Sequence, residues 1–446
     1  MTPLFGTDGV RGVANADLTP ELALAVARAA VAALLPSGGR VIVGRDSRTS
    51  GPMLEAALAA GFASSGVDVG LAGVIPTPAI SFLIKDERAD LGAVLSASHN
   101  PPEDNGIKLF DSAGRKLTVD QEAQVEALLS ELLPPSRRVG TIEPIEAAAS
   151  RYAAFLTGAI DGESVDLSGL TLVADCAYGA TSLIAPRVFR HLGARVEELH
   201  AVPDGCRINV GCGSTHLGPL RQAVRDYHAD LGVAFDGDGD RVLLVAPDGR
   251  TIDGDHVLGI VALHYARHGG LVPPAVVSTI LANYGLESRL REEGIELVRT
   301  PVGDRNVAQA MMARAARLGG EPSGHIIFAD HAPTGDGILT AVKLLEVAHE
   351  AGASFERLAS QIPLYPQAQH NVPCSGLGSA SASSVLFEEV EAEALGRLGG
   401  RGRVIIRRSG TQPVVRVFVE AEDAEQAEDA CRSAAERLTR ELQAFA

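Results

Sequence analysis

The chain of 446 residues is too long for one hydrophobic core, and its apolar content of 46% is sufficient for several. A formal net charge of −17 argues against nonspecific nucleic-acid binding, which needs a basic surface, so an anionic substrate must meet cations gathered locally. The five cysteines are scattered and the N-terminus lacks a signal peptide, which together predict reduced thiols in the cytoplasm. The apolar run at residues 22–35 contains Arg28 and is shorter than a membrane span.

The first predicted unit alternates helices with strands. Thr19 is a favourable N-cap and Pro20 a favourable first helical residue, so a helix is expected to begin there. The predicted order is a helix at 20–35, a strand at 40–43, a helix at 51–65, a strand at 67–71, a helix at 78–87, and strands at 90–95 and 106–110. This alternation is typical of a mostly parallel sheet covered by helices.

The same pattern restarts twice. After a predicted helix at 144–160, the second unit has strands at 170–175, 195–199, 231–235 and 242–246, with helices at 181–191 and 218–227. The third has helices at 254–267 and 286–293, with strands at 275–279 and 295–298.

The end of the chain differs from the three α/β units. Predicted strands at 369–373, 403–407 and 414–420, with helices at 383–395 and 424–442, suit a small α+β domain. We therefore predict three related mixed α/β domains and a C-terminal α+β domain. Their expected boundaries are residues 1–150, 151–253, 254–366 and 367–446.

Ser98 lies just after a predicted strand, in the segment L-S-A-S-H-N-P-P. Asn100 and the prolines after it favour a stiff turn that cannot continue as a helix. A hydroxyl held on such a turn, with the titratable His99 beside it, is a candidate nucleophile. The same residues also suit a turn whose serine only satisfies its own backbone. Lys108, one of four lysines in the chain, follows closely.

A candidate metal loop lies between two predicted strands. Asp236, Asp238 and Asp240 alternate with glycines, and carboxylates so spaced can fold around one hard cation. A calcium-binding EF-hand is rejected, because its sixth and twelfth positions require Gly and Glu where this chain has Arg241 and Pro247. Three protein ligands leave Mg²⁺ with open positions for a phosphate, which Arg241 is placed to neutralise.

Three further segments carry groups that suit a phosphosugar. In F-G-T-D-G-V-R-G, Arg11 lies among glycines that allow close approach to a phosphate. In G-E-P-S-G-H, Glu321, Ser323 and His325 can pair with sugar hydroxyls, although a structural turn is the default interpretation. The segment R-R-S-G-T-Q-P combines arginines, hydroxyls and glycine in an anion-binding nest. Its candidate residues are Arg407, Ser409, Gly410, Thr411 and, beyond it, Arg416.

In combination the motifs are specific. S-A-S-H-N-P, D-G-D-G-D-R, G-E-P-S-G-H and R-x-S-G-T-x-P, in this order, resemble the α-D-phosphohexomutase superfamily over the entire chain. F-G-T-D-G-V-R-G and I-P-L-Y-P-Q at 362–367 are most similar to bacterial phosphoglucosamine mutases. That resemblance implies three related α/β domains and a fourth domain resembling the TATA-binding-protein fold. It also implies interconversion of glucosamine 6-phosphate and glucosamine 1-phosphate, for synthesis of the cell wall precursor UDP-N-acetylglucosamine.

The resemblance further implies a role for each candidate residue. Ser98 is the expected phosphoserine, and a sugar 1,6-bisphosphate is the expected intermediate and activator. One Mg²⁺ per chain is expected on Asp236, Asp238, Asp240 and the phosphate of Ser98. The groups expected around the reacting phosphate, where they assist proton transfer, are Arg11, His99 and Lys108. The sugar is expected to contact Glu321, Ser323 and His325. The distal phosphate is expected to contact Arg407, Ser409, Gly410, Thr411 and Arg416.

Two residues depart from the family pattern, which usually has Glu at Gln412 and Asn at Tyr178. Neither departure removes a proposed catalytic group, so we expect them to affect the rate of the reaction more than the identity of the enzyme. The alternatives left open are the same chemistry on glucose or mannose phosphates, an idle sugar-phosphate binding protein, and a phosphatase. The expected partner is a small phosphosugar, with no nucleic acid and no membrane, and the oligomeric state stays open, a homodimer included.

Overall fold

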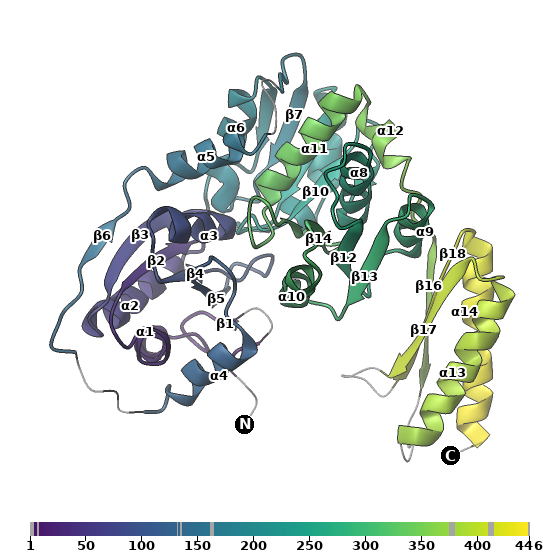
Figure 1. The fold of residues 1–446 in the computed structure, drawn as a ribbon, viewed down its shortest axis with the longest axis horizontal. Coiled ribbons are helices and arrows are strands. Elements are labelled where there is room, and N and C mark those ends of the chain that lie inside the picture. Colours follow the sequence, from purple (N-terminus) through teal and green to yellow (C-terminus); the bar gives the residue numbers. More distant parts are fainter. Residues whose placement is uncertain are drawn as a thin grey trace. The chain divides into compact units, whose positions relative to one another are not determined.

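The computed structural model describes residues 4–6, 9–131, 133, 136–160, 165–373, 380–408 and 414–444. They form two compact units. The first comprises the described residues of Met1–Leu281 and Ile295–Gln361, and the second those of Ala282–Gly294 and Ile362–Ala446. Figure 1 labels their elements in chain order. Among these residues, no helix has the length and apolar character that crossing a membrane requires.

The described residues of the first unit form three sheets, and each sheet with its helices is here called a layer. The first layer has a six-stranded sheet. Its strands are β1 (Val10–Val13), β2 (Arg40–Arg45), β3 (Asp68–Val74), β4 (Leu91–Leu95), β5 (Asp104–Asp111) and β6 (Ile142–Pro144). Its helices are α1 (Pro20–Leu34), α2 (Gly51–Ser64), α3 (Thr77–Asp86) and α4 (Val119–Ala127). In the order β1-β5-β4-β2-β3-β6, the last four strands run parallel, and β5 is antiparallel to both of its neighbours.

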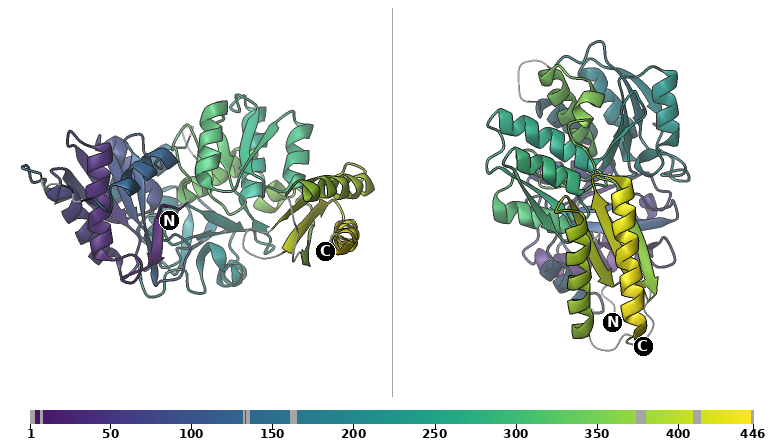
Figure 2. Two further views of the ribbon diagram at one scale, coloured as in Figure 1. Left: turned by 90° about the horizontal axis from the view of Figure 1, so that it is seen from below. Right: turned by 90° about the vertical axis from the view of Figure 1, so that its right-hand side faces the viewer.

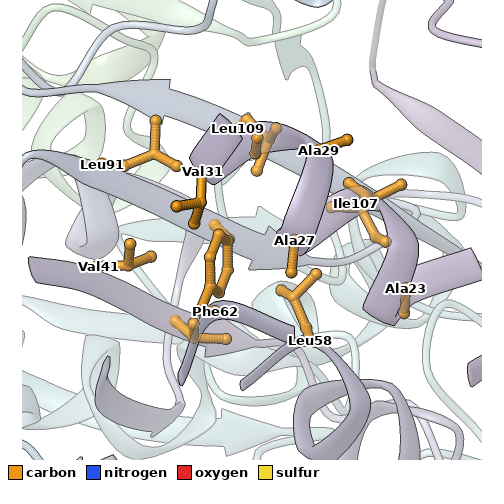
Figure 3. Packing of buried hydrophobic residues seen from close by; sticks show 14 of the residues in the cluster. Ala23, Ala27, Ala29, Val31, Val41, Leu58, Phe62, Leu91, Ile107 and Leu109 are labelled. Carbon is orange, nitrogen blue, oxygen red and sulfur yellow. The ribbon is translucent and has the colours of Figure 1, made fainter. Parts of the chain in front are cut away.

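Helices α1 and α2 pack together against this sheet, as Figure 3 shows. Small residues such as Ala23 and Ala27 let the helices approach closely, and a Cβ on Gly61 would lie 2.6 Å from Leu24 O. Phe62 fills the space between the helices and the strands and is fully buried. Burial of such a side chain is worth about 1.5–3 kcal/mol, so this core fixes β4, the strand that leads to Ser98.

The second layer contains β7 (Thr171–Asp175), β8 (Arg195–Leu199), β9 (Leu231–Phe235), β10 (Val242–Val245) and β11 (Thr251–Ile252). Its helices are α5 (Ala148–Gly158), η1 (Ala180–Leu183), α6 (Ala185–His191), η2 (Gly213–Thr215) and α7 (Gly218–Asp226). The order is β11-β10-β9-β7-β8, with β9, β7 and β8 parallel. β9 and β10 form an antiparallel hairpin in which Phe235 pairs with Val242, so the D-G-D-G-D-R loop lies at its tip.

Two helix predictions in this part of the chain are wrong in detail. The single helix predicted at 181–191 is two short helices, because Pro186 has no N–H and is tolerated only in the first turn of α6. The helix predicted at 144–160 begins only at Ala148, because the residues before it pair with β3 as strand β6.

The third layer contains β12 (Ala275–Thr279), β13 (Glu296–Thr300), β14 (Leu318–Gly320) and β15 (Ile326–Phe328). Its helices are α8 (Gly254–Arg267), α10 (Asp304–Arg314), α11 (Gly337–Ala351) and α12 (Phe355–Ala359). In the order β13-β12-β14-β15 the first three strands are parallel and β15 is antiparallel to β14. The G-E-P-S-G-H segment connects β14 to β15, which places it at one edge of this sheet.

The second unit has an antiparallel sheet of β16 (Gln367–Pro373), β17 (Gly402–Arg408) and β18 (Val414–Ala421), in the order β16-β18-β17. Helices α13 (Ala380–Arg397) and α14 (Ala424–Ala444) cover one face of it, as Figure 2 shows, and α9 (Tyr284–Glu292) belongs to the same unit. Val415, Val417 and Val419 are fully buried on the covered face. Three mixed α/β layers and a small α+β sheet confirm the predicted fold class.

Candidate active site

Ser98 lies three residues beyond β4 and is 1% exposed. Ser98 Oγ donates a 2.6 Å hydrogen bond to Asp236 Oδ2 and lies 3.3 Å from His99 Nδ1. The predicted nucleophile and the predicted metal loop, 138 residues apart in sequence, therefore meet in one buried site. A serine that served only its own turn would not contact another layer of the protein in this way.

The three aspartates of the D-G-D-G-D-R loop form a compact buried group. Asp236 and Asp238 are fully buried, Asp240 is 4% exposed, and one oxygen from each lies within 4.8 Å of the others. Within the described residues, Asp238 Oδ1 and Asp240 Oδ1 are buried without a hydrogen-bond donor. A buried oxygen without a partner costs about 1–3 kcal/mol or more when charged. Arg241 Nε lies 3.8 Å from Asp240 Oδ1, too far for a hydrogen bond. Carboxylate oxygens that lack a hydrogen bond and are grouped so closely suit a hard divalent cation, and the group therefore suggests a metal site.

Lys108 and Thr77, both from the first layer, hold one of these aspartates. Lys108 Nζ donates to Asp238 Oδ2 at 2.8 Å and lies 3.6 Å from Asp240 Oδ2, and Thr77 Oγ1 donates to the same Asp238 oxygen at 2.6 Å. Burial raises the pKa of Asp238, but the charge and hydrogen bond of Lys108 outweigh it and leave the pKa below its usual value. Burial, then the charges of Asp240 and Asp238, raise the pKa of Asp236 well above its usual value.

His99 is flanked by arginines. Arg241 Nη1 lies 3.1 Å from His99 Nδ1, and because a guanidinium only donates, this ring nitrogen is the acceptor and carries no proton. Burial, followed by the positive charges of Arg241 and Arg11, lowers the pKa of His99, so the imidazole is neutral near pH 7. Arg11 lies on β1 opposite Gly106 of β5, where a Cβ would come within 3.0 Å of its side chain.

The G-E-P-S-G-H loop lies against the β9–β10 hairpin that carries the three aspartates. Val242 N, at the start of β10, donates to Gly324 O at 3.1 Å, and a Cβ on Gly324 would lie 2.1 Å from Val242 O. Only glycine fits there, and its φ of 91° also favours glycine. Glu321 is 8% exposed, and its Oε1 accepts a 3.1 Å hydrogen bond from Gly303 N. The loop is thus held beside the aspartates.

The other two residues of this loop differ in exposure. Ser323 is exposed, whereas His325 is buried, with its Nε2 3.5 Å from Asp304 Oδ2. Lys116 of the first layer pairs with the same Asp304. Asp304 therefore links Lys116 of the first layer to His325 of the G-E-P-S-G-H loop.

The chain matches four family models, one for each part of the fold. Residues 2–133, 150–249 and 253–365 match the alpha/beta/alpha domains I, II and III of phosphoglucomutase/phosphomannomutase, and residues 368–437 match its C-terminal domain. The chain is 48% identical over 430 residues to a phosphoglucosamine mutase of Pelotomaculum thermopropionicum, covering 95% of this chain and 96% of the relative. It is 45% identical over 448 residues to a phosphoglucosamine mutase of Salinispora arenicola, covering 98% of each.

The chain belongs to the phosphoglucomutase/phosphomannomutase family. A family protein from Burkholderia thailandensis has a similar structure, with a TM-score of 0.80, 26% identity and 98% of each chain covered. An Aspergillus fumigatus N-acetylphosphoglucosamine mutase, solved with GlcNAc-6P and magnesium, has a TM-score of 0.66 at 18% identity, covering 98% of this chain and 95% of its own. The second likeness supports the fold alone.

The second unit of this phosphohexomutase carries the two arginines predicted to hold the distal phosphate. Arg407 of β17 and Arg416 of β18 are directly opposite each other in the sheet. Like charges at such a cross-strand pair repel, so an anion bound between them would stabilise the pair. The loop residues predicted with them, Ser409, Gly410, Thr411 and Gln412, lie outside the described residues.

Asp175, at the end of β7, lies within 4.8 Å of His200 and Cys212, a combination that also occurs at metal sites. Its Oδ1 accepts from Ala177 N and His200 Nδ1, both at 3.0 Å, and its Oδ2 accepts from Gly213 N at 2.9 Å. Both oxygens are therefore already used to organise the loops around β7.

Tyr178 occupies a position where the family usually has Asn. Its φ of 54° is left-handed, a conformation that Asn tolerates better than Tyr. The ring compensates by packing 4.8 Å from the His200 ring, with the Arg207 guanidinium 4.3 Å above it. The ring is thus accommodated by residues of the second layer, and the carbonyl of Tyr178 accepts a 2.7 Å hydrogen bond from Ser47 Oγ of the first layer.

Three residues that contact the site were not predicted from the sequence. Thr77 bonds Asp238, and Arg48 and Asn209 each donate to the main-chain carbonyl of Ser98. An available signal was the segment G-R-D-S-R at 44–48, which places charged residues directly after a buried strand.

Proposed function

We propose that this protein is a phosphoglucosamine mutase that interconverts glucosamine 6-phosphate and glucosamine 1-phosphate through a phosphoserine at position 98. The observation that carries the proposal is the 2.6 Å hydrogen bond from Ser98 Oγ to Asp236, within a buried group of three aspartates. It is supported by relatives 45–48% identical over nearly the full chain, whose names state this activity.

One Mg²⁺ is the expected occupant of the aspartate group. Asp236, Asp238 and Asp240 would hold it together with the phosphate on Ser98, and the two buried oxygens without a hydrogen bond, Asp238 Oδ1 and Asp240 Oδ1, fit such a cation. When bound, Mg²⁺ supplies positive charge that draws electrons from the transferring phosphoryl group.

The first half-reaction transfers the phosphoryl group from Ser98 to the free hydroxyl of the sugar monophosphate. The bond from phosphorus to Ser98 Oγ breaks as a bond to the sugar oxygen forms. The sugar hydroxyl loses a proton and Ser98 Oγ gains one. Neutral His99, whose Nδ1 is 3.3 Å from Ser98 Oγ, is suited to relay it, while Arg11, Lys108 and Arg241 balance the charge of the phosphoryl oxygens.

The product of this step is a sugar 1,6-bisphosphate. It must reorient in the site before its other phosphoryl group is transferred to Ser98. Arg407 and Arg416 would hold the phosphate that is not reacting, and Glu321 and Ser323 would contact the sugar. The net reaction moves a phosphate between the two ends of the sugar and leaves the enzyme phosphorylated. We place this reaction in the cytoplasm, where the four free cysteines among the described residues would stay reduced.

Turnover compared on the 6-phosphates of glucosamine, glucose and mannose, with a sugar 1,6-bisphosphate as activator, tests the assignment. The highest kcat/KM is expected for glucosamine phosphate. An equal or higher value for mannose or glucose phosphate would move the assignment to phosphomannomutase or phosphoglucomutase. Release of inorganic phosphate without isomerisation would indicate a phosphatase, and binding without turnover an idle binding protein.

A further inference from the structure

Arg48, between β2 and α2, is fully buried, which is rare for an arginine. A guanidinium has five N–H donors, and all five of Arg48 are used. Its Nε donates to Asp46 Oδ2 at 2.9 Å, and its Nη1 and Nη2 each donate to two main-chain carbonyls. Those carbonyls belong to Ser98, Asn100, Pro101 and Asp104. One cation thus binds the main chain of the serine loop at four points.

A second chain of hydrogen bonds reaches the same loop through the amide N–H of Ser98. Asp46 Oδ2 accepts from Ser96 Oγ at 2.7 Å, and Ser96 Oγ accepts from Ser98 N at 2.8 Å. Arg48 therefore fixes the carbonyl of Ser98 directly, and its ion pair with Asp46 fixes the amide of Ser98 through Ser96.

Asn209 brings the second layer to the same two carbonyls. Its Nδ2 donates to Ser98 O at 2.9 Å and to Asn100 O at 3.1 Å. A Cβ on Gly237 would lie 2.8 Å from Ser98 O and 2.9 Å from Asn209 Nδ2, so the metal loop also packs on this point. The carbonyl of Ser98 is therefore a junction of the serine loop, the metal loop and the Asn209 loop.

The serine loop needs such support. Ser98 has a φ of 52°, a left-handed conformation that costs a residue other than glycine about 1–2 kcal/mol. The cost is tolerated only where surrounding contacts hold the backbone. Misplacing a reacting group by about 1 Å can lower the rate roughly 100-fold, so a relaxed loop would impair phosphoryl transfer without abolishing substrate binding.

We propose that Arg48 and Asn209 are positioning residues that hold Ser98 at its strained angle against the metal loop. Arg48 sets the loop within its own layer, and Asn209 joins it to the second layer. The inference rests on the proposed function only in taking Ser98 as the phosphorylated residue.

The test measures how fast Ser98 is phosphorylated by glucose 1,6-bisphosphate, followed by intact mass. In this step a phosphorus–oxygen bond of the sugar breaks, the Ser98 Oγ–phosphorus bond forms, and the serine proton passes to the sugar oxygen. Arg48→Ala is expected to lower this rate and kcat about 100-fold while KM stays within about twofold. Added guanidinium ion, which fits the vacated space, is expected to restore at least about tenfold of the loss.

Arg45→Ala is the matched control, because Arg45 ends the same strand β2 but pairs with Glu55 of α2. Its rate should not respond to guanidinium. A folded Arg48→Ala variant with unchanged kcat, or one whose rate guanidinium does not change, would overturn the role of Arg48.

Asn209→Gly keeps the proposal testable if Arg48→Ala does not fold, because Asn209 is half-buried on a loop. Asn15→Gly is its control, since both asparagines have a φ of 63° and glycine adopts that angle freely. Asn209→Gly should slow Ser98 phosphorylation about tenfold at an unchanged thermal midpoint, and Asn15→Gly should not. Equal rates in the two variants would refute the proposal. Because the readout is Ser98 phosphorylation, a failure of glucosamine specificity would leave this result interpretable.

Discussion

Lys108 is the cation that the structure places among the three aspartates, and its removal gives a sharp prediction. It is 2% exposed and donates to Asp238 Oδ2 at 2.8 Å. Breaking a buried ion pair by removing one partner typically costs about 3–5 kcal/mol, because the other charge stays buried. Lys108→Met should therefore destabilise the first unit by about that amount in EDTA. Saturating Mg²⁺ should recover a large part of the loss, because the metal supplies the missing charge.

The pH dependence of this loss follows from the pKa of Asp238. In the wild type that pKa lies below its ordinary value of 3.8, so the carboxylate adds stability above pH 3.8 that is lost as the pH falls through the folded-state pKa. Lys108 is the largest of the causes that lower this pKa, so its removal should raise the pKa of Asp238 in the variant. The loss of stability of Lys108→Met in EDTA should therefore be larger at about pH 7 than at about pH 4, where the carboxylate begins to bind a proton.

The assay is thermal unfolding of wild type and variant in EDTA and in MgCl₂, with Lys343→Met as the control. Lys343 is also fully buried and pairs with Glu346 at 3.0 Å within α11, so its loss should destabilise comparably. Mg²⁺ should reduce the loss of thermal stability only in Lys108→Met. If Mg²⁺ reduces this loss equally in both variants, or in neither, the assignment of the aspartates as a cation site is refuted.

Four further predictions concern other groups of the site. Asp238→Asn should weaken Mg²⁺ binding measured by calorimetry and sharply lower kcat, and activity that survives thorough chelation would contradict this. Wild type should carry a phosphoryl mass that Ser98→Ala lacks, and full mutase activity of the variant with added bisphosphate would refute the phosphoserine. Arg416→Ala should raise KM about 10–100-fold and release bisphosphate into solution, since a charge-assisted bond is worth about 1.5–3 kcal/mol; an unchanged KM without release would assign Arg416 to its own strand. His99→Gln should abolish the acid limb of the kcat/KM profile, where wild-type activity rises with pH through the lowered His99 pKa, below 6.5; a limb that persists would exclude His99.

The layers of the fold were predictable because most of their strands are short apolar runs that end in Gly, Pro or polar residues. Helix α11 was not predicted, although Thr340, Lys343 and Glu346 recur every three residues. Every residue from Gly337 to Ala348 is buried, so these polar side chains do not mark a solvent-exposed face. Strand β6 was missed for the opposite reason: Ile142–Pro144 is exposed and carries no strand pattern, and it is a strand only because β3 offers it a partner.

The candidate residues of the site could be named one by one from the sequence, whereas their assembly into one site could not. Ser98 and Asp236 each stand out because small and polar residues follow a buried strand. Nothing in their spacing says that two loops 138 residues apart share a hydrogen bond. That step came from the order of the four motifs, which is a property of a family and not of local physics.

Arg48 and Asn209 show why the supporting residues of a site are hard to identify from the sequence. Their partners are main-chain carbonyls, which every residue possesses and no sequence pattern marks. The carbonyls of Ser98 and Asn100 need donors because they are not paired in the strand ladder, and a buried carbonyl left unpaired costs about 1–3 kcal/mol. Both carbonyls lie beyond β4, on the loop where Ser98 adopts a φ of 52°. The buried arginine and the asparagine from the second layer supply the donors that the strand ladder does not, and in doing so they stabilise that strained backbone.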